Sequence, residues 1–277
     1  MLQERSVKTE VRYEAAITIG SLAKGKDDHV KKLLNCDPEP ISVLLTVLEE
    51  DDDRLNDACL SCLKTFAQNN KSLDIPYTAK HFQKLLSFIG PTESLIRQSR
   101  ITNILSHACK SFEEQNILSY LGAAQIFPVL LGVHNTAIRI HTLACMAAFC
   151  YKNPMIAHEL VETTYRCIQV PKLLSPLVSR DKPVEMQLEA ARCLTNLYRA
   201  GALNLNDRVI LFQTLPCLVR LCQVSSLSLF LECSRCVFNC VGINSGRVQL
   251  GTVPQWTTVV IVYRKIYCSV LTVVSIY

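Results

Sequence analysis

A helical segment in residues 182–201 constrains the fold most strongly, because similar segments recur along the chain. Apolar residues stand at steps of three from Leu188 to Leu197, as expected for one face of an α-helix. The small Ala190–Ala191 pair favours close approach of a second helix, and Gly201 supplies a residue that often ends a helix in the left-handed conformation. The segment therefore predicts one helix of a packed helical protein.

Five other segments repeat this pattern at a nearly constant spacing. One apolar position aligns in all six, at intervals of about 44, 42, 41, 48 and 43 residues. Helical repeats of the armadillo and HEAT types have periods of about 40–47 residues, so all but one interval falls in that range. The six aligned positions are Ile19, Leu63, Leu105, Met146, Leu194 and Val237.

Proline supplies a second marker with the same period. Pro40, Pro128, Pro171 and Pro216 each precede an apolar run, and the run at residues 81–86 lacks a proline. Proline is tolerated in the first helical turn, where its missing N–H has no partner within the helix. Each unit is thus predicted to contain a helix started by proline, a polar link and a second, longer helix. The two markers predict an all-α, armadillo- or HEAT-like α-solenoid of about six repeats over residues 1–250.

The last residues depart from the repeat. Residues 251–277 are rich in β-branched side chains and lack a helical stripe, so we expect a tail outside the repeats. Arg264 and Lys265 interrupt its apolar runs, whereas a membrane span needs about 20 apolar residues. No membrane span is therefore expected.

Composition and charge narrow the functional classes. The net charge of +5 is spread over 29 basic and 24 acidic residues without a long basic run, which does not indicate a nucleic-acid partner. The acidic run Glu49–Asp53 is expected to be a solvated loop. Met1–Arg5 leads into polar sequence, so no secretory signal is expected, and the fourteen cysteines then indicate a reducing compartment, cytoplasm or nucleus.

Candidate chemical sites are sparse. The Cys59/Cys62 and Cys233/Cys236 pairs have zinc-ligand spacing, but both fall at apolar positions of the repeat, where cysteine usually packs as a small hydrophobe. The histidines stand singly, and the glycines form no phosphate-binding loop. We therefore expect no catalytic residue, metal, cofactor or small-molecule substrate.

The repeat unit resembles the armadillo repeat, in which Glu-Ala-Ala, apolar residues, Asn-Leu and Gly precede Leu-Pro-x-Leu-Val-x-Leu. The resemblance is more specific to the family of armadillo repeat-containing protein 8; it covers about residues 1–250 and is strongest over 180–222. Members of that family are longer at both ends, so the chain is expected to be partial. The segments that carry the resemblance are Gly20–Ala23, Ala58–Leu63, Asp181–Leu188, Arg199–Ala202 and Thr214–Arg220.

This resemblance implies a non-catalytic scaffold of the GID or CTLH ubiquitin ligase, which supports proteasomal degradation while other subunits carry the RING chemistry. The expected partners are protein subunits of that ligase, and the expected location is cytoplasmic and nuclear. The alternative is an adhesion or endosomal-trafficking adaptor of the catenin kind, which binds a peptide in its concave groove.

The resemblance also suggests where partners would bind. Armadillo proteins that hold extended peptides use a row of asparagines on the repeated inner helix, and only Asn196 and Asn239 fill that row here. Either asparagine is equally well explained by a structural bond near a helix end. Arg199 and Arg220 are predicted to be exposed contacts on the same repeat. The other positions of the row are Ser21, Thr65, His107 and Ala148.

Overall fold

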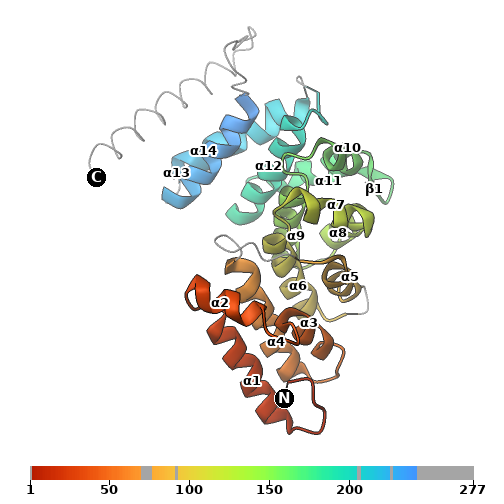
Figure 1. Cartoon of the computed structure of the whole chain (residues 1–277). Helices are drawn as coiled ribbons and strands as arrows, with labels where there is room; N and C mark the ends of the chain where they lie inside the picture. Colours follow the sequence, from red (N-terminus) through yellow and green to blue (C-terminus); the bar gives the residue numbers. More distant parts are fainter. Residues whose placement is uncertain (1, 70–76, 91–92, 205–206, 225–226, 242–277) are drawn as a thin grey trace, which may run out of the picture. The chain divides into compact units, whose positions relative to one another are not determined.

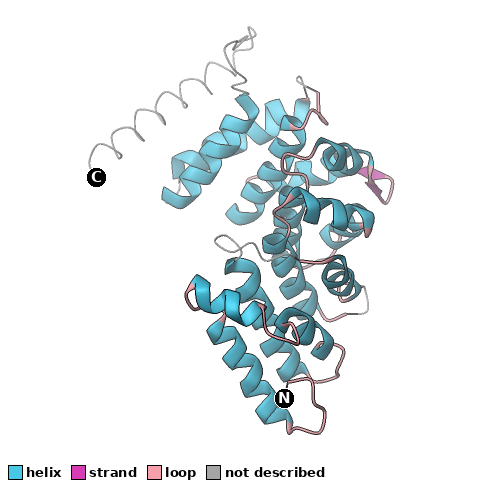
Figure 2. Cartoon of the chain, viewed as in Figure 1, coloured by secondary structure: helices cyan, strands magenta, loops and turns pink. Residues whose placement is uncertain are grey.

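The computed structural model describes residues 2–69, 77–90, 93–204, 207–224 and 227–241. These residues are mostly helical, with loops between the helices and a single short hairpin of two strands among the described residues (Figure 2). The chain divides into two compact units, Met1–Phe149 and Cys150–Tyr277. The predicted tail at residues 251–277 lies outside the described residues, so its structure stays a prediction.

Four long helices form the repeated element of the first unit (Figure 1). Each packs against the next in order, and each carries one of the aligned apolar positions. The spacing of those positions therefore predicted the stacked helices of this unit correctly. They are α1 (Thr9–Leu22), α4 (Asp53–Asn69), α6 (Leu95–Ala108) and α9 (Thr136–Phe149).

Shorter helices accompany these four. In the first unit α3 packs on α4 and α5, and α5 packs on α7, so the shorter helices make a second layer. Fully buried aromatic side chains, including Phe66, Phe82 and Phe127, fill the space within the unit. The shorter helices are α2 (Asp27–Leu34), α3 (Pro40–Val47), α5 (Ala79–Ser87), α7 (Phe112–Tyr120) and α8 (Ala123–Leu131).

The second unit repeats the same plan. α12 (Val184–Arg199) packs against α13 (Leu215–Val224) and α14 (Leu227–Val241), and α12 and α14 carry the aligned positions. Ala190 and Ala191 are fully buried, and Gly201 follows α12 with a φ of +78°, as the sequence predicted. The remaining elements are α10 (Pro154–Glu162), β1 (Thr164–Tyr165), β2 (Ile168–Gln169), α11 (Val170–Leu174), the 3₁₀ helix η1 (Ser175–Val178) and the π-helix η2 (Ile210–Thr214).

The predicted role of proline as a helix start holds at two positions and is wrong at two. Pro40 begins α3 and Pro171 is the second residue of α11. Pro128 lies inside α8, which starts at Ala123. Pro216 is the second residue of α13, but the π-helix η2 runs directly into α13, so Pro216 does not begin the helical segment. A wide π turn before Pro216 accommodates a residue that cannot donate to the carbonyl four positions earlier and whose ring crowds it.

Side-chain caps define several of the helix starts, both without proline (α5 and α7) and with it (α10, which begins at Pro154). The Thr78 hydroxyl accepts from the His81 N–H at 3.4 Å, and Ser111 accepts from Glu114 at 3.1 Å. Asn153, fully buried, accepts from Ile156 N–H at 3.4 Å. Such caps satisfy donors that the first turn leaves without partners, and they explain how α5 begins without a proline.

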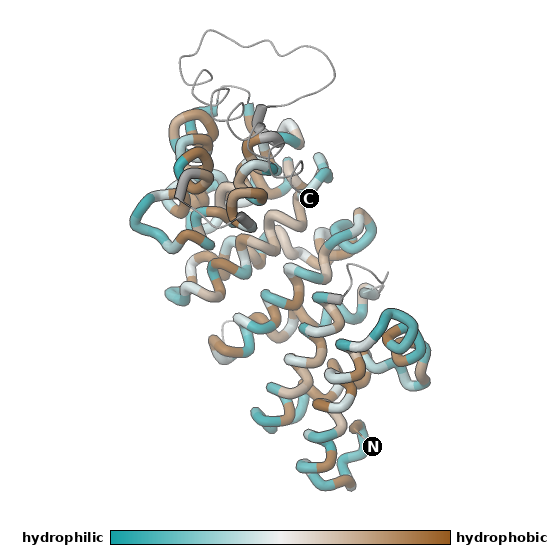
Figure 3. The backbone as a smooth tube through the Cα atoms, turned by 90° about the vertical axis from the view of Figure 1, so that its left-hand side faces the viewer, coloured by the Kyte–Doolittle hydropathy of each residue, from teal (hydrophilic) through white to brown (hydrophobic). Residues whose placement is uncertain are grey.

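Hydrophobic and hydrophilic residues alternate in short bands along the helices (Figure 3), as expected for helices buried on one side. Among the described residues, no helix combines the length and the apolar character that crossing a membrane requires.

Candidate functional site

A polar side chain recurs at one position of the repeat, seven residues before the aligned apolar position. In five units this side chain donates a hydrogen bond to a backbone carbonyl in the segment that precedes its helix, and we call these contacts link clamps. Four of the five side chains are buried, so these four clamps also satisfy a polar group within the core. The five bonds are Arg12 Nε to Leu2 O (2.8 Å), Asn56 Nδ2 to Glu50 O (2.8 Å), Gln98 Nε2 to Gly90 O (2.8 Å), Arg139 Nε to Val133 O (2.8 Å) and Gln187 Nε2 to Lys182 O (2.6 Å).

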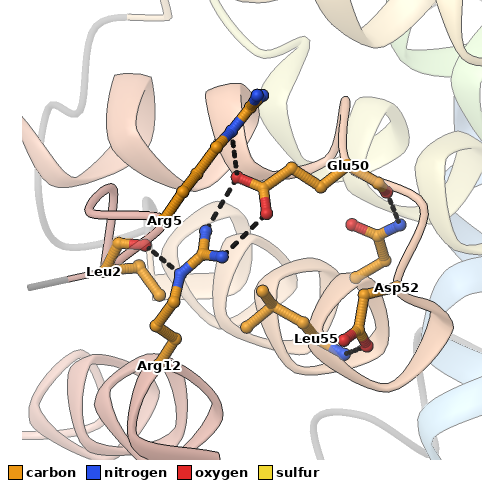
Figure 4. Close-up of polar contacts among 7 residues, drawn as sticks. Leu2, Arg5, Arg12, Glu50, Asp52 and Leu55 are labelled. Atoms are coloured by element: carbon orange, nitrogen blue, oxygen red, sulfur yellow. Dashed lines mark hydrogen bonds and ion pairs between the residues drawn. The ribbon is translucent and has the colours of Figure 1, made fainter. Parts of the chain in front are cut away.

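The first clamp includes an ion pair (Figure 4). Arg12 Nη1 and Nη2 donate to the two oxygens of Glu50 at 2.7 and 2.8 Å, while Arg5 Nε lies 3.6 Å from the same carboxylate. The bonds from Arg12 lower the pKa of Glu50, and those to Glu50 raise the pKa of Arg12. The Glu49–Asp53 run was predicted to be a solvated loop; at Glu50 that prediction is wrong, because a buried arginine holds its carboxylate.

Three of the long helices of the first unit, α1, α4 and α6, border a groove of about 610 Å³. Ser21 and Thr65, two positions of the predicted ligand row, line it. Their hydroxyls donate to the carbonyls of Ile17 and Ser61, each at 3.0 Å, so both side chains keep only acceptor capacity toward a partner.

Charged and aromatic groups also line this groove, beside small and apolar residues. The Arg54 guanidinium lies 4.1 Å from the centre of the Tyr13 ring, and Arg100 pairs with Asp57. Lys24 and Lys64 also line the groove, and no ion pair to either lysine occurs in the part of the chain that the structure describes. The surface is therefore mixed in charge with two available ammonium groups.

One cluster brings serine, histidine and glutamate together, as in hydrolytic triads. Ser42 Oγ lies 2.9 Å from His81 Nε2, and Glu39 lies within 3.2 Å of the same nitrogen. The Thr78 N–H donates to His81 Nδ1 at 3.3 Å, so the neutral ring carries its proton on Nε2. The ring therefore cannot accept the Ser42 proton, which goes to Glu39 at 2.6 Å, and the cluster joins α3 to α5 rather than activating a nucleophile.

The cysteine pairs with zinc spacing are packed in helices. Cys59 and Cys62 in α4 and Cys233 and Cys236 in α14 are at most 2% exposed. Burial raises the pKa of Cys59, Cys62 and Cys236 to about 12, which disfavours the thiolate that metal binding needs. Within the described residues, no group of three or more potential ligands is arranged to hold a metal ion.

The predicted partner-binding residues have different environments. Asn196 lies in α12 with only 4% of its surface exposed, and Arg199 is exposed in the last turn of that helix. Asn239 belongs to α14, but its side chain lies outside the described part of the structure. Arg220 is half-buried in α13 and donates to Gln187 Oε1 and to Cys217 Sγ. The structure thus brings Arg220 to the fifth link clamp.

The link clamps were missed in the sequence. Arg, Asn and Gln differ in charge and length, so the residues at this position share no letter, and only their common ability to donate an N–H marks it. The available signal was a polar residue at the same point of five of the six units, inside an otherwise apolar stripe.

Comparison with known proteins supports both the fold and the family resemblance. Armadillo repeat-containing protein 8 from Mus musculus is 37% identical over 232 residues, which are 82% of this chain and 33% of that protein. The protein of the same name from Xenopus laevis is 35% identical over the same share of this chain and 31% of its own length. No family model matches the chain.

Solved structures extend the comparison to the fold. The designed armadillo repeat protein YIII(Dq)4CqI superposes with a TM-score of 0.62 at 15% identity, covering 86% of this chain and 96% of its own. The engineered protein OR329 gives a TM-score of 0.65 at 18% identity, covering 85% and 92%. The chain is thus a homologue of armadillo repeat-containing protein 8 with the armadillo fold, and it spans about a third of the length of those relatives.

Proposed function

We propose that the chain is a non-catalytic scaffold subunit of a GID- or CTLH-type ubiquitin ligase, acting in proteasomal degradation in the cytoplasm and nucleus. The homology to armadillo repeat-containing protein 8 over 82% of the chain carries this proposal. Stacked helical repeats suit such a role, because they present extended surfaces for other proteins.

The His81 cluster and the buried cysteines agree with a role that needs no chemistry of its own. The hydrogen-bond directions in the cluster deny Ser42 a general base, and the cysteine pairs occupy core positions. The scaffold is therefore expected to act through protein contacts, while partner subunits supply catalysis.

Co-purification tests the ligase assignment. A tagged chain expressed in cells is expected to recover RING-containing and LisH-containing subunits, identified by mass spectrometry. The matched control is Leu105→Ala, which removes a fully buried side chain of α6 and is expected to reduce recovery by weakening the fold. Consistent absence of RING and LisH subunits from the wild-type sample would overturn the proposal.

The groove of the first unit supports the alternative, a catenin-like adhesion or trafficking adaptor. Two lysines without ion pairs among the described residues suit an acidic, extended peptide there. A peptide array read with the wild type and with Lys24→Glu/Lys64→Glu decides between the two. Peptides lost only in the double variant, together with no ligase subunits recovered, favour the adaptor.

A further inference from the structure

A cleft of about 510 Å³ in the second unit lies between α13 and the segment formed by η1 and the residues after it. Its size is in the range of about 300–1,000 Å³ typical of ligand sites. Two arginines, Arg180 and Arg220, are the charged side chains in its lining, and among the described lining residues there is no carboxylate. The cleft is therefore positively charged.

Contacts with Gln187 and Cys217 fix the position of the Arg220 side chain. Gln187, which is 2% exposed, donates to the Lys182 carbonyl at 2.6 Å through its link clamp, and its Oε1 accepts from Arg220 Nη2. The Cys217 sulfur lies 3.5 Å from the same nitrogen. Because both contacts involve Nη2, the remaining N–H groups of the guanidinium have no hydrogen bond within the part that the structure describes. The buried amide of Gln187 thus orients the N–H donors of the Arg220 guanidinium at the cleft.

Arg180 also lacks a carboxylate partner among the described residues. The adjacent Asp181 is engaged elsewhere, because Lys182 Nζ lies 2.5 Å from its Oδ2. The bond from Lys182, with one from Ser179, lowers the pKa of Asp181 to about 2. The neighbouring acidic group is thus neutralised by its own lysine, and the charge of Arg180 remains available.

We propose that this cleft binds an acidic segment of a partner protein. In this complex Arg220 donates hydrogen bonds to one carboxylate or phosphate group, and Arg180 forms an ion pair with a second negative charge. An arginine fork matches the two oxygens of such groups, and bonds between ionised groups are about twice as strong as neutral ones. The proposal rests on the protein-binding role proposed above and names the chemistry of one partner segment.

Fluorescence anisotropy with the purified chain tests this cleft. The probes are a labelled peptide containing several glutamates, the same peptide with glutamines, and a version with phosphoserines. We expect the glutamate peptide to bind at least about tenfold more tightly than the glutamine peptide, and Arg180→Gln and Arg220→Gln each to weaken it about tenfold. Arg220→Lys keeps the charge without the fork and is expected to recover only part of the affinity.

Arg166→Gln is the matched control, because it removes an exposed arginine of the same unit from the turn between β1 and β2. This variant is expected to bind within twofold of the wild type. Arg180→Gln keeps the test valid if Arg220→Gln fails to fold, since the Arg180 side chain is exposed; equal urea midpoints for Arg180→Gln and the wild type verify its fold.

The outcomes separate the possible results. Equal binding of the glutamate and glutamine peptides, or an equal loss in Arg166→Gln, would overturn the proposal. Tighter binding of the phosphoserine peptide by tenfold would support it with phosphate as the ligand, and similar binding would support it with carboxylate. If the peptide binds specifically but co-purification recovers no ligase subunits, only the ligase assignment is overturned. If co-purification recovers the subunits but the peptide does not bind, only the proposed binding at the cleft is overturned.

Discussion

At the scale of single residues, the contact between Arg12 and Glu50 combines a clamp with a charge pair. Arg12→Ala is expected to destabilise the chain by about 1.5–3 kcal/mol, because hydrogen bonds to a charged group are lost and Glu50 stays partly buried. Urea unfolding measures the change. The control is Arg5→Ala, whose side chain is 79% exposed and is expected to change stability by less than about 0.5 kcal/mol. Equal effects of the two variants would contradict this account.

The same pair gives a pH dependence of known sign. Arg12 lowers the pKa of Glu50 from its ordinary value of 4.5, so the stabilisation is fully present above that value and is lost as the pH falls through the lowered pKa. The difference in unfolding free energy between wild type and Arg12→Ala is therefore expected to narrow below about pH 4.5. A constant difference from pH 7 to pH 3 would exclude the charge pair as its source.

His81 gives a pH dependence of the same sign in a higher pH range. Burial lowers its pKa below the ordinary 6.5, an effect that the charge of Glu39 partly opposes. A histidine that is neutral in the fold contributes stability that is fully present above 6.5 and is lost as the pH falls from there through the lowered value. The fall in unfolding free energy between pH 7.5 and 5.5 is expected to be smaller in His81→Gln than in the wild type. The same fall in both proteins would argue against burial of an uncharged ring.

At the scale of elements, the link clamps fix how each long helix follows its link. Gln98 donates to the carbonyls of Gly90 and Glu93, at 2.8 and 3.3 Å. Gln98→Met keeps the shape but leaves these carbonyls without that donor, so we expect a loss of about 1–3 kcal/mol in urea unfolding. Gln125→Met, at an exposed position of α8, is the control and is expected to be nearly neutral. A neutral Gln98→Met would show that the clamp does not stabilise the repeat.

These elements also show what the sequence could and could not predict. The period of the apolar residues located the long helices, because a helix that is buried on one face in every repeat needs apolar residues at the positions of that face. The starts of the shorter helices were less predictable: Pro128 is the sixth residue of α8 and Pro216 comes after a π turn, so neither proline begins its helical segment. Arg220 was expected to be exposed, and only its contact with Gln187, distant in sequence, reveals its half-buried position.

At the scale of the whole molecule, each repeat contacts mainly its neighbours, so a destabilising substitution in one repeat should affect only that repeat and the adjacent ones. Leu105 is fully buried in α6, which packs against α4 and α9. Leu105→Ala is expected to cost about 2–5 kcal/mol through loss of packing. Native-state hydrogen exchange should then accelerate in α4, α6 and α9 and stay unchanged in α12, which belongs to the second unit.

The control for this prediction is Leu95→Ala, because Leu95 is 49% exposed at the start of the same helix and should leave exchange in α4 and α9 unchanged. If Leu105→Ala accelerates exchange equally in α12, the two units unfold as one cooperative body, and the stability of each repeat depends on the entire chain. If the faster hydrogen exchange is confined to the first unit, substitutions there can probe its groove while the cleft lined by Arg180 and Arg220 in the second unit keeps its structure. The exchange pattern therefore decides whether the two proposed binding surfaces can be tested independently.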